Sequence, residues 1–339
     1  MISMNHSFQK IETVDMHTGG EPLRIVISGF PSFEQSSILA TRETILKEYD
    51  HLRKSIMWEP RGHRDMYGLL RIEAEREDSA FGVIFMHNEG YSTMCGHATI
   101  AIGKAAVELG WIKDILEPFT SFNIDAPCGQ LSITSKVIDG KVKQVSFKNV
   151  PSFYVGTYNT QFESYGEISY DLAYGGAFYA YTDIVQFGMN LSTENSFDLI
   201  SLGKRFKQHV IKTNTEIIHP SQKEMSFLYG CIFREEHQDE EVHSKNVCIF
   251  ADGELDRSPT GSGVSGRAAI LHANGTLQLN QGIKINSIID SQMSVKIVRE
   301  VNYHGVNAVI PEVTGNAFFT GKHEFWLDPE DHLGKGFLL

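Results

Sequence analysis

Cysteine is scarce in this sequence of 339 residues, which contains four: Cys95, Cys128, Cys231 and Cys248. Four cysteines are too few for the disulfide framework that stabilises small secreted scaffolds, so we expect all four to be reduced. Long hydrophobic runs are also missing, because nowhere do about 18 apolar residues follow one another, the length that a membrane span requires. The N-terminal residues lack the basic and then apolar pattern of a signal peptide. These absences predict a cytoplasmic protein without a membrane anchor.

The sequence has fewer basic than acidic residues. The 30 lysines and arginines are outnumbered by 42 aspartates and glutamates, which gives a formal net charge of −12, and the basic residues form no compact run. This balance excludes a nucleic acid or an anionic membrane as partner and favours a small-molecule substrate. A hydrophobic content of 41% is typical of a folded globular chain. The length favours two domains or one large domain, and no Pro-rich or low-complexity linker marks a boundary.

The apolar pattern predicts a mixed α/β fold without regular βαβ alternation. In residues 41–58 the apolar side chains recur at spacings of three and four, which places them on one face of a helix. Residues 98–109 form a second predicted helix. Its many glycines and alanines indicate burial, because glycine inside a helix costs about 1 kcal/mol relative to alanine. A third helix is predicted at 198–212. The predicted strands cover residues 11–16, 23–28, 67–74, 80–87, 131–137, 143–147, 176–180, 247–250 and 293–298.

The most acidic stretch, residues 234–244, predicts an exposed turn between strands. Consecutive carboxylates in one short segment cannot all converge on a cation, and the sequence has no HExxH or CxxC spacing to supply further ligands. The spacings of His17, His63 and His87 match no ligand motif either, so we expect these histidines to form hydrogen bonds within the fold. No metal site is predicted.

A weak internal repeat relates two segments that lie 165 residues apart. Cys95 aligns with Thr260, and Gly110 aligns with Gly275. Each copy begins with a small nucleophile-type residue and a glycine, continues through a helix of small residues, and ends at a glycine suited to a left-handed helix stop. The repeat predicts two related halves, each with one such helix.

The starts of these two helices form a candidate site. The first N–H groups of a helix have no intrahelical partner and carry the positive end of the helix dipole, so two facing starts can share one carboxylate. The same dipole is expected to lower the pKa of the Cys95 thiol from about 8.5, which makes Cys95 a candidate base. The alternative is a small buried hydrophobic residue, the usual role of a free cysteine. The neighbours Gly96 and His97 favour function, whereas the other three cysteines are interpreted as structural.

The segment before the second helix start, residues 251–263, is rich in glycine but lacks the lysine of a GxxxxGK[ST] phosphate loop. Within it, Asp256 is a candidate partner for the ammonium group of a substrate. Two alternatives stay open for this carboxylate: capping of the helix start, and an ion pair with Arg257.

Five ordered motifs resemble those of the proline racemase family. They cover about residues 11–321, and they are Asp15–Arg24, Glu59–His63, Met94–His97, Asp256–Gly261 and Pro311–Gly315. The resemblance implies the diaminopimelate-epimerase-like fold: two pseudo-symmetric α/β halves, each with a mixed, mostly antiparallel sheet around a central helix, and a site in the cleft between them. We expect residues 1–165, completed by 322–339, to form the half that carries Cys95. Residues 166–321 are expected to form the half that carries Thr260.

The sequence departs from the racemase pattern at one position. Racemases of this family have cysteine at both helix starts, one to remove the α-proton and one to return it from the opposite face. Thr260 stands at the second start, and its hydroxyl has no accessible ionisation at neutral pH, so two-base racemisation is expected to fail. The Cys95 and Thr260 pair resembles the trans-3-hydroxy-L-proline dehydratase branch of the family.

Dehydration needs a single thiol. In a trans-3-hydroxyproline the hydroxyl and the α-hydrogen lie on the same ring face, so one side of the site can serve both steps. Cys95 is expected to remove the α-proton, and Cys95 or His97 to protonate the leaving hydroxyl. The resulting enamine tautomerises to Δ1-pyrroline-2-carboxylate. The catalytic residues expected are Cys95, His97 and Thr260. The substrate-binding residues expected are Gly96, His97, Asp256, Gly261 and Ser262, with backbone N–H groups holding the carboxylate.

Other interpretations stay open. The alternative for His97 is a structural histidine with no part in proton transfer. The chain is alternatively a proline or hydroxyproline racemase or epimerase that uses another group in place of the second thiol, or a non-catalytic amino-acid-binding protein that kept the cleft. No organic cofactor and no metal are expected. The partner expected is an imino acid, and the resemblance implies a homodimer.

Overall fold

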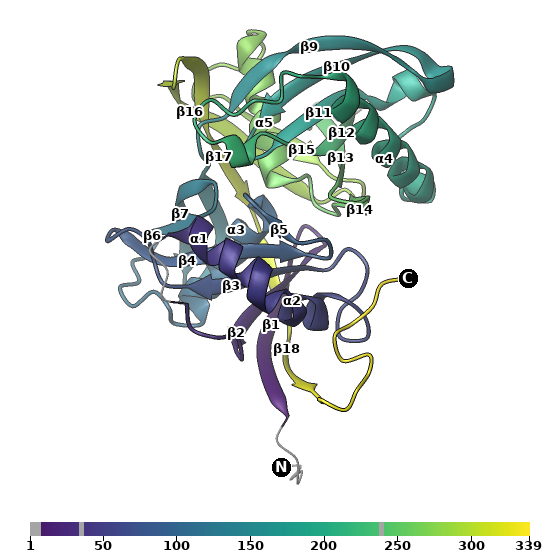
Figure 1. Cartoon of the computed structure of the whole chain (residues 1–339). Helices are drawn as coiled ribbons and strands as arrows, with labels where there is room; N and C mark the ends of the chain where they lie inside the picture. Colours follow the sequence, from purple (N-terminus) through teal and green to yellow (C-terminus); the bar gives the residue numbers. More distant parts are fainter. Residues whose placement is uncertain (1–7, 34–36, 237–240) are drawn as a thin grey trace.

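Two lobes make up the molecule (Figure 1). The computed structural model describes residues 8–33, 37–236 and 241–339. Within these residues, hydrogen bonds connect eighteen strands into one continuous sheet that runs through both lobes. Most neighbouring strands are antiparallel, as the mixed and mostly antiparallel fold class predicts.

The first lobe contains the strands β1 (Gln9–Thr18), β2 (Glu21–Ser28), β3 (Tyr67–Ile72), β4 (Ser79–His87), β5 (Tyr91–Ser92), β6 (Phe119–Ala126), β7 (Gly129–Ile138), β8 (Lys141–Lys148) and β18 (Ala317–Leu327). Its helices are α1 (Ile38–Thr44), the π-helical η1 (Ile45–Tyr49), α2 (Asp50–Met57) and α3 (Gly96–Glu108). Helices α1 and α2 with η1 between them occupy the predicted helix at 41–58, so that helix is confirmed. Its middle turn is π-helical.

The second lobe contains the strands β9 (Phe153–Phe162), β10 (Gly166–Tyr174), β11 (Phe178–Asp183), β12 (Leu228–Glu236), β13 (Ser244–Phe250), β14 (Glu254–Leu255), β15 (Gly282–Asn286), β16 (Gln292–Tyr303) and β17 (Val306–Gly315). Its helices are α4 (Ser196–Thr213) and α5 (Gly261–Ala273), with the short 3₁₀ helices η2 (Glu163–Tyr165), η3 (Ile184–Phe187), η4 (Thr193–Asn195) and η5 (Lys223–Met225).

The order of elements is the same in both lobes, which confirms the predicted repeat. In the first lobe β2 pairs in parallel with β3 and β4 with β6, and in the second lobe β11 pairs in parallel with β12 and β13 with β15. Each lobe places a helix between its first parallel pair of strands and a second, central helix after a short two-residue strand. The central helices are α3 and α5. Both are followed by a glycine with positive φ, Gly110 at 72° and Gly275 at 75°, which is the left-handed stop that the sequence predicts.

The strand pairing shows where the lobes meet. Strand β9 pairs with β10, and β18 pairs with β1 from its first residue, Ala317. Strand β9 thus lies with the second lobe although it precedes residue 165, and β18 lies with the first lobe although it begins before residue 322. Strand β17 pairs with β8 and joins the two lobes. The division into two domains remains a prediction.

Helix α3 lies in the core of its lobe, where it contacts β1, β7 and β8. Eleven of its thirteen residues are buried. A helix that is apolar all round is stable only when other elements surround it. Gly103 shows how close the packing is, because a Cβ atom there would lie 2.5 Å from Cγ1 of Val145 on β8. The small residues of this helix therefore serve packing, as their pattern predicts.

Two predictions about strands and turns need correction. The strand predicted at 176–180 begins at Phe178, because Gly175 and Gly176 form the turn between β10 and β11, and Gly176 has a φ of 98°. The acidic turn predicted at 234–244 is partly strand, since β12 extends to Glu236 and β13 begins at Ser244. Residues 237–240 within it lie outside the described residues.

Candidate active site

The first residues of α3 and α5 meet between the lobes. A Cβ atom added to Gly96 would lie 2.3 Å from Cα of Gly261, so only glycine allows the two backbones to approach this closely. Cys95 is the N-cap residue of α3, and Thr260 is the N-cap residue of α5. The structure thus brings together the two positions that the repeat aligns.

A small cavity lies at this meeting point. The space open to the centre of a water molecule is about 20 Å³, roughly what one water needs. The cavity is therefore too small for a ring the size of proline. The lining residues are Tyr67, Met94, Cys95, Gly96, His97, Tyr179, Tyr229, Phe250, Asp256, Thr260, Gly261 and Ser262.

A larger cavity of about 710 Å³ lies elsewhere, beside the C-terminal part of α5 and strands β16 and β17. It shares no lining residue with the small cavity. We place the candidate site at the small cavity, because the thiol, the helix starts and the buried carboxylate converge there.

Cys95 lies against His97. The distance from Cys95 Sγ to His97 Nδ1 is 3.2 Å, and the Ala98 N–H donates to the same sulfur at 3.4 Å. The prediction of a lowered pKa for the Cys95 thiol is wrong. Burial raises the pKa of Cys95 well above its ordinary value, Asp256 and Glu21 raise it further, and hydrogen bonds from Ala98 and Tyr67 lower it only in part.

His97 is neutral at physiological pH. Its side chain is buried, and burial lowers its pKa to about 4. A neutral imidazole with Nδ1 unprotonated can accept the thiol proton across 3.2 Å. His97 also has a structural contact, since its backbone carbonyl accepts a hydrogen bond from Thr18 Oγ1 at 2.9 Å. The catalytic and structural interpretations of His97 are therefore compatible.

Asp256 holds the second helix start in place. Its Oδ1 accepts a hydrogen bond from the Ser258 N–H at 2.7 Å, and its Oδ2 accepts one from Thr260 Oγ1 at 2.8 Å. The capping alternative is wrong, because Ser258 and Thr260 both precede Gly261, the first residue of α5, and Asp256 accepts no N–H of that helix. The ion pair with Arg257 is wrong, because that guanidinium pairs with Asp65 at 2.7 Å. The role of Asp256 toward a substrate ammonium remains a prediction.

Thr260 has a strained backbone. Its φ is 67° and its ψ is 96°. A β-branched residue rarely adopts this conformation, which costs on the order of 1–3 kcal/mol. Two hydrogen bonds hold the residue there, one from its hydroxyl to Asp256 and one from its N–H to Ser258 Oγ at 3.1 Å. The conformation directs the hydroxyl back to Asp256.

The remaining predicted residues also lie at the cavity. Ser262 Oγ is hydrogen-bonded to the Tyr179 hydroxyl at 2.7 Å. Gly96, His97, Gly261 and Ser262 occupy the first turns of α3 and α5, where backbone N–H groups lack intrahelical partners. Their binding of a substrate carboxylate stays a prediction.

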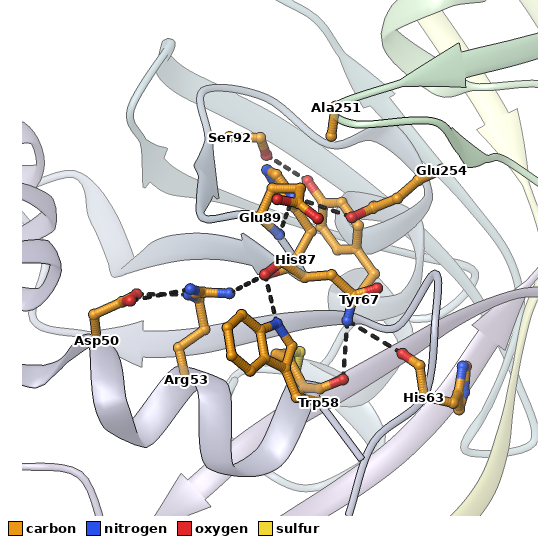
Figure 2. Close-up of polar contacts among 12 residues, drawn as sticks. Asp50, Arg53, Trp58, His63, Tyr67, His87, Glu89, Ser92, Ala251 and Glu254 are labelled. Carbon is orange, nitrogen blue, oxygen red and sulfur yellow. Dashed lines mark hydrogen bonds and ion pairs between the residues drawn. The ribbon is translucent and has the colours of Figure 1, made fainter. Parts of the chain in front are cut away.

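The sequence interpretation missed the aromatic walls of the cavity. Tyr67 from β3, Tyr179 from β11, Tyr229 from β12 and Phe250 from β13 all line it. Tyr67 donates or accepts a hydrogen bond with Ser92 (Figure 2), and the buried Tyr229 hydroxyl has no partner among the described residues. In the sequence these aromatics resemble ordinary core residues, and no local signal separates them.

The other three cysteines and the histidines His17, His63 and His87 do not line the cavity. All four cysteines are free, and burial raises the pKa of both Cys128 and Cys231 to about 12. His17 and His87 each accept a backbone N–H on Nδ1, and His63 Nδ1 lies 2.6 Å from the Arg64 carbonyl. In residues 8–33, 37–236 and 241–339 no three His, Cys, Asp or Glu side chains are grouped so as to hold a metal ion. No helix in these ranges is long and apolar enough to cross a bilayer.

Two curated relatives match nearly the whole chain. A trans-3-hydroxy-L-proline dehydratase of Colwellia psychrerythraea is 49% identical over 98% of this chain and 94% of its own length. The human trans-3-hydroxy-L-proline dehydratase is 39% identical over 97% of this chain and 94% of its own length.

Solved structures show the same fold. A hydroxyproline epimerase of Agrobacterium vitis, solved with trans-4-hydroxy-L-proline bound, has a TM-score of 0.91 and 29% identity over 98% of this chain and 96% of its own. Methylitaconate-delta-isomerase, at 14% identity and a TM-score of 0.56, shares the fold only. The predicted diaminopimelate-epimerase-like fold is confirmed. Residues 13–338 match the proline racemase family, so this chain belongs to the proline racemase family.

Proposed function

We propose that this protein dehydrates trans-3-hydroxy-L-proline to Δ1-pyrroline-2-carboxylate. The observation that carries the proposal is the pairing at the two helix starts, where one thiol, Cys95, faces a threonine, Thr260. The hydroxyl of Thr260 donates to Asp256 and has no accessible ionisation at neutral pH. A site with one sulfur can remove an α-proton but cannot return it from the opposite face. The names of the dehydratases at 49% and 39% identity support the same reaction.

Substrate binding prepares the thiol. The substrate carboxylate binds to the N–H groups at the starts of α3 and α5, which carry the positive ends of both helix dipoles. Its ammonium group binds beside Asp256. In the empty site Asp256 and Glu21 raise the pKa of Cys95, and a positive charge at Asp256 offsets this effect. The Cys95 proton passes to His97 Nδ1, 3.2 Å away.

The elimination then needs only one sulfur, that of Cys95. The thiolate of Cys95 takes the α-proton, and the electron pair of that C–H bond forms the Cα–Cβ double bond as the Cβ–O bond breaks. The departing hydroxide takes a proton from the Cys95 thiol or from His97 and leaves as water. The helix N–H groups stabilise the charge that develops next to the carboxylate. The enamine tautomerises to the cyclic imine. No metal or cofactor takes part in this scheme.

Incubation with trans-3-hydroxy-L-proline tests the proposal. We expect a product that reacts as a cyclic imine, with no D-proline formed from L-proline and no exchange of its α-hydrogen with solvent deuterium. Formation of D-proline contradicts the dehydratase proposal in favour of a racemase. Tight binding of pyrrole-2-carboxylate without turnover contradicts it in favour of a binding protein. We also propose that the protein is a cytoplasmic homodimer, which sedimentation and cell fractionation test.

A further inference from the structure

An arginine of the second lobe is held by two carboxylates of the first lobe. The backbone N–H of Arg257 donates to Oε2 of Glu21, the first residue of β2, at 2.7 Å. The guanidinium Nη1 of Arg257 donates to Oδ2 of Asp65 at 2.7 Å. Glu21 is 0% exposed and Asp65 is 6% exposed. Hydrogen bonds to carboxylates are stronger than bonds between neutral groups, so these three residues, which we call the interlobe cluster, tie the two lobes together.

The turn between β1 and β2 packs against the same part of the second lobe. Ser291 Oγ donates to the carbonyl of Gly19 at 2.8 Å. Gly20 has a φ of 87°, a conformation that glycine adopts freely, and a Cβ atom added to it would lie 3.5 Å from Cβ of Arg257. The turn that precedes Glu21 is therefore in close contact with Arg257.

The interlobe cluster acts on the peptide bond that begins at Asp256. Asp256 lines the cavity, and its side chain accepts hydrogen bonds from Ser258 and Thr260, which both belong to the second lobe. Those two bonds do not fix the carboxylate relative to Cys95, which lies in the first lobe. The N–H of Arg257 belongs to the peptide bond after Asp256, so its bond to a first-lobe carboxylate fixes the backbone of Asp256 relative to the thiol.

Three carboxylates lie around the guanidinium of Arg257, those of Glu21, Asp65 and Asp256. Burial lowers the pKa of Arg257, but these carboxylates raise it above its ordinary value. Burial also raises the pKa of Glu21 well above its ordinary value, and the nearby charge of Asp256 raises it further. Without the positive charge of Arg257 the carboxylates would repel one another, so the guanidinium keeps Asp256 close to the first lobe.

We propose that Arg257 is a positioning residue, which holds the carboxylate of Asp256 where it can bind the ammonium group of an imino acid while Cys95 faces the α-carbon. Arg257 does not line the cavity, so it acts through Asp256 and not by contact with the substrate. The proposal rests on the proposed function through this role of Asp256. A ligand with a cationic amine then depends on Arg257, and a ligand without one does not.

Binding of two ligands at neutral pH tests the proposal. L-proline carries an ammonium group and a carboxylate, whereas pyrrole-2-carboxylate carries a carboxylate and an uncharged ring nitrogen. All chains carry Cys95→Ala, so that neither ligand reacts, and calorimetry measures the dissociation constants. For Arg257→Met we expect an affinity loss of at least about tenfold for L-proline and of less than about threefold for pyrrole-2-carboxylate. Loss of a positive charge alone would weaken the binding of the anion more than that of the zwitterion, so net charge does not produce this selectivity.

Conservative variants show whether the ion pair is responsible. A single nitrogen of Arg257 contacts Asp65, so a lysine ammonium can replace that bond, and Arg257→Lys is expected to bind L-proline within about threefold of the parent. Asp65→Asn removes the charge, and asparagine tolerates the φ of 64° at this position. It should weaken L-proline selectively, and adding it to Arg257→Met should cost no further affinity, because both changes break the same ion pair.

Arg64→Met is the matched control, because it removes an exposed positive charge from the residue next to Asp65. An exposed charge contributes little, so we expect both affinities to stay within about twofold of the parent. If Arg257→Met does not fold, the selectivity of Asp65→Asn and the affinity of Arg257→Lys decide.

Equal losses for the two ligands in Arg257→Met or in Asp65→Asn would mean a merely structural role and would overturn the proposal. Unchanged binding of L-proline in these variants overturns it as well, and so does a parent that binds neither ligand. Dehydration of trans-3-hydroxy-L-proline by the chain that keeps Cys95 tests the proposed function separately. Selective loss without dehydration contradicts only the proposed function, whereas dehydration without selective loss contradicts only the role of Arg257.

Discussion

The central helices α3 and α5 have the same length and equivalent places in the two lobes, but their N-cap residues, Cys95 and Thr260, form different contacts. Cys95 has an extended backbone, with φ at −142°, and its sulfur accepts the Ala98 N–H. Thr260 lies at a φ of 67°, does not cap its helix, and donates its hydroxyl to Asp256, four residues earlier. The repeated backbone brings together two helix starts whose first N–H groups lack intrahelical partners. We propose that the side chains divide the chemistry, with the base Cys95 at one start and the carboxylate of Asp256 anchored at the other.

Loss of the thiol is the largest expected effect. Cys95→Ser replaces the base with a hydroxyl that is far too weak, and the dehydration rate is expected to fall by roughly 10²–10⁴-fold with the fold intact. Imine formation from trans-3-hydroxy-L-proline measures it. Cys128→Ser is the matched control, since Cys128 is a free cysteine that does not line the cavity. Substantial activity in Cys95→Ser would remove this residue from the mechanism.

Asp256→Asn tests the other helix start. The substitution removes the charge that is expected to hold the substrate ammonium, and a charge-assisted hydrogen bond contributes about 1.5–3 kcal/mol, so kcat/KM should fall by about 10–100-fold. Asp252→Asn is the control, because Asp252 is an exposed carboxylate four residues earlier that does not line the cavity. Unchanged kcat/KM in Asp256→Asn would leave Asp256 with only its structural bonds to Ser258 and Thr260.

The pH profile tests how the thiol loses its proton. Burial raises the pKa of Cys95 and lowers the pKa of His97 to about 4, so the reactive free form, a thiol beside a neutral imidazole, does not change between about pH 6 and 8 and kcat/KM should be flat there. Below about pH 4, kcat/KM should fall by up to about tenfold per unit, because protonated His97 cannot take the thiol proton. A tenfold rise per unit between pH 6 and 8 would mean that Cys95 loses its proton to solvent, and it would contradict the transfer to His97.

A smaller effect on stability is expected from the strained backbone of Thr260, a strain that Cys95 does not share. Thr260→Ala and Thr260→Gly both lose the hydroxyl bond to Asp256, but only glycine adopts a φ of 67° freely. We expect Thr260→Gly to be more stable than Thr260→Ala by about 1 kcal/mol in urea unfolding. Dehydration should be only mildly reduced in Thr260→Ala. Equal stabilities would mean that the strain is relieved when alanine replaces threonine.

Local patterns predicted the parts of the site that lie together in the sequence. The repeat located Cys95 and Thr260 at helix starts, and the glycines and alanines of residues 98–109 indicated a buried helix. The aromatic lining of the cavity was not predictable, because Tyr67 and Tyr229 reach it through strand pairing that joins distant segments. The direction of the Cys95 pKa shift was missed for the same reason, since burial by both lobes outweighs the local dipole. Strands β9 and β10 were not predicted, because polar residues interrupt their aromatic and apolar residues.

The last prediction places a thiol at the start of α5, as there is at the start of α3. Thr260→Cys nearly conserves side-chain volume and places a thiol at the start that faces Cys95. Racemisation needs a thiolate on one ring face and a thiol on the other, each restored by the preceding turnover. We expect low but measurable racemisation of proline, seen as solvent deuterium at the α-position of both enantiomers. The activity should be low because Thr260 has an unusual backbone conformation, and a misplacement of about 1 Å can cost on the order of 10²-fold in rate. Cys95→Ser in the same chain is the control, and it should abolish the exchange. If a folded Thr260→Cys chain binds pyrrole-2-carboxylate and exchanges no deuterium, then the two helix starts do not act on opposite faces of one substrate, and the division of chemistry between them is wrong.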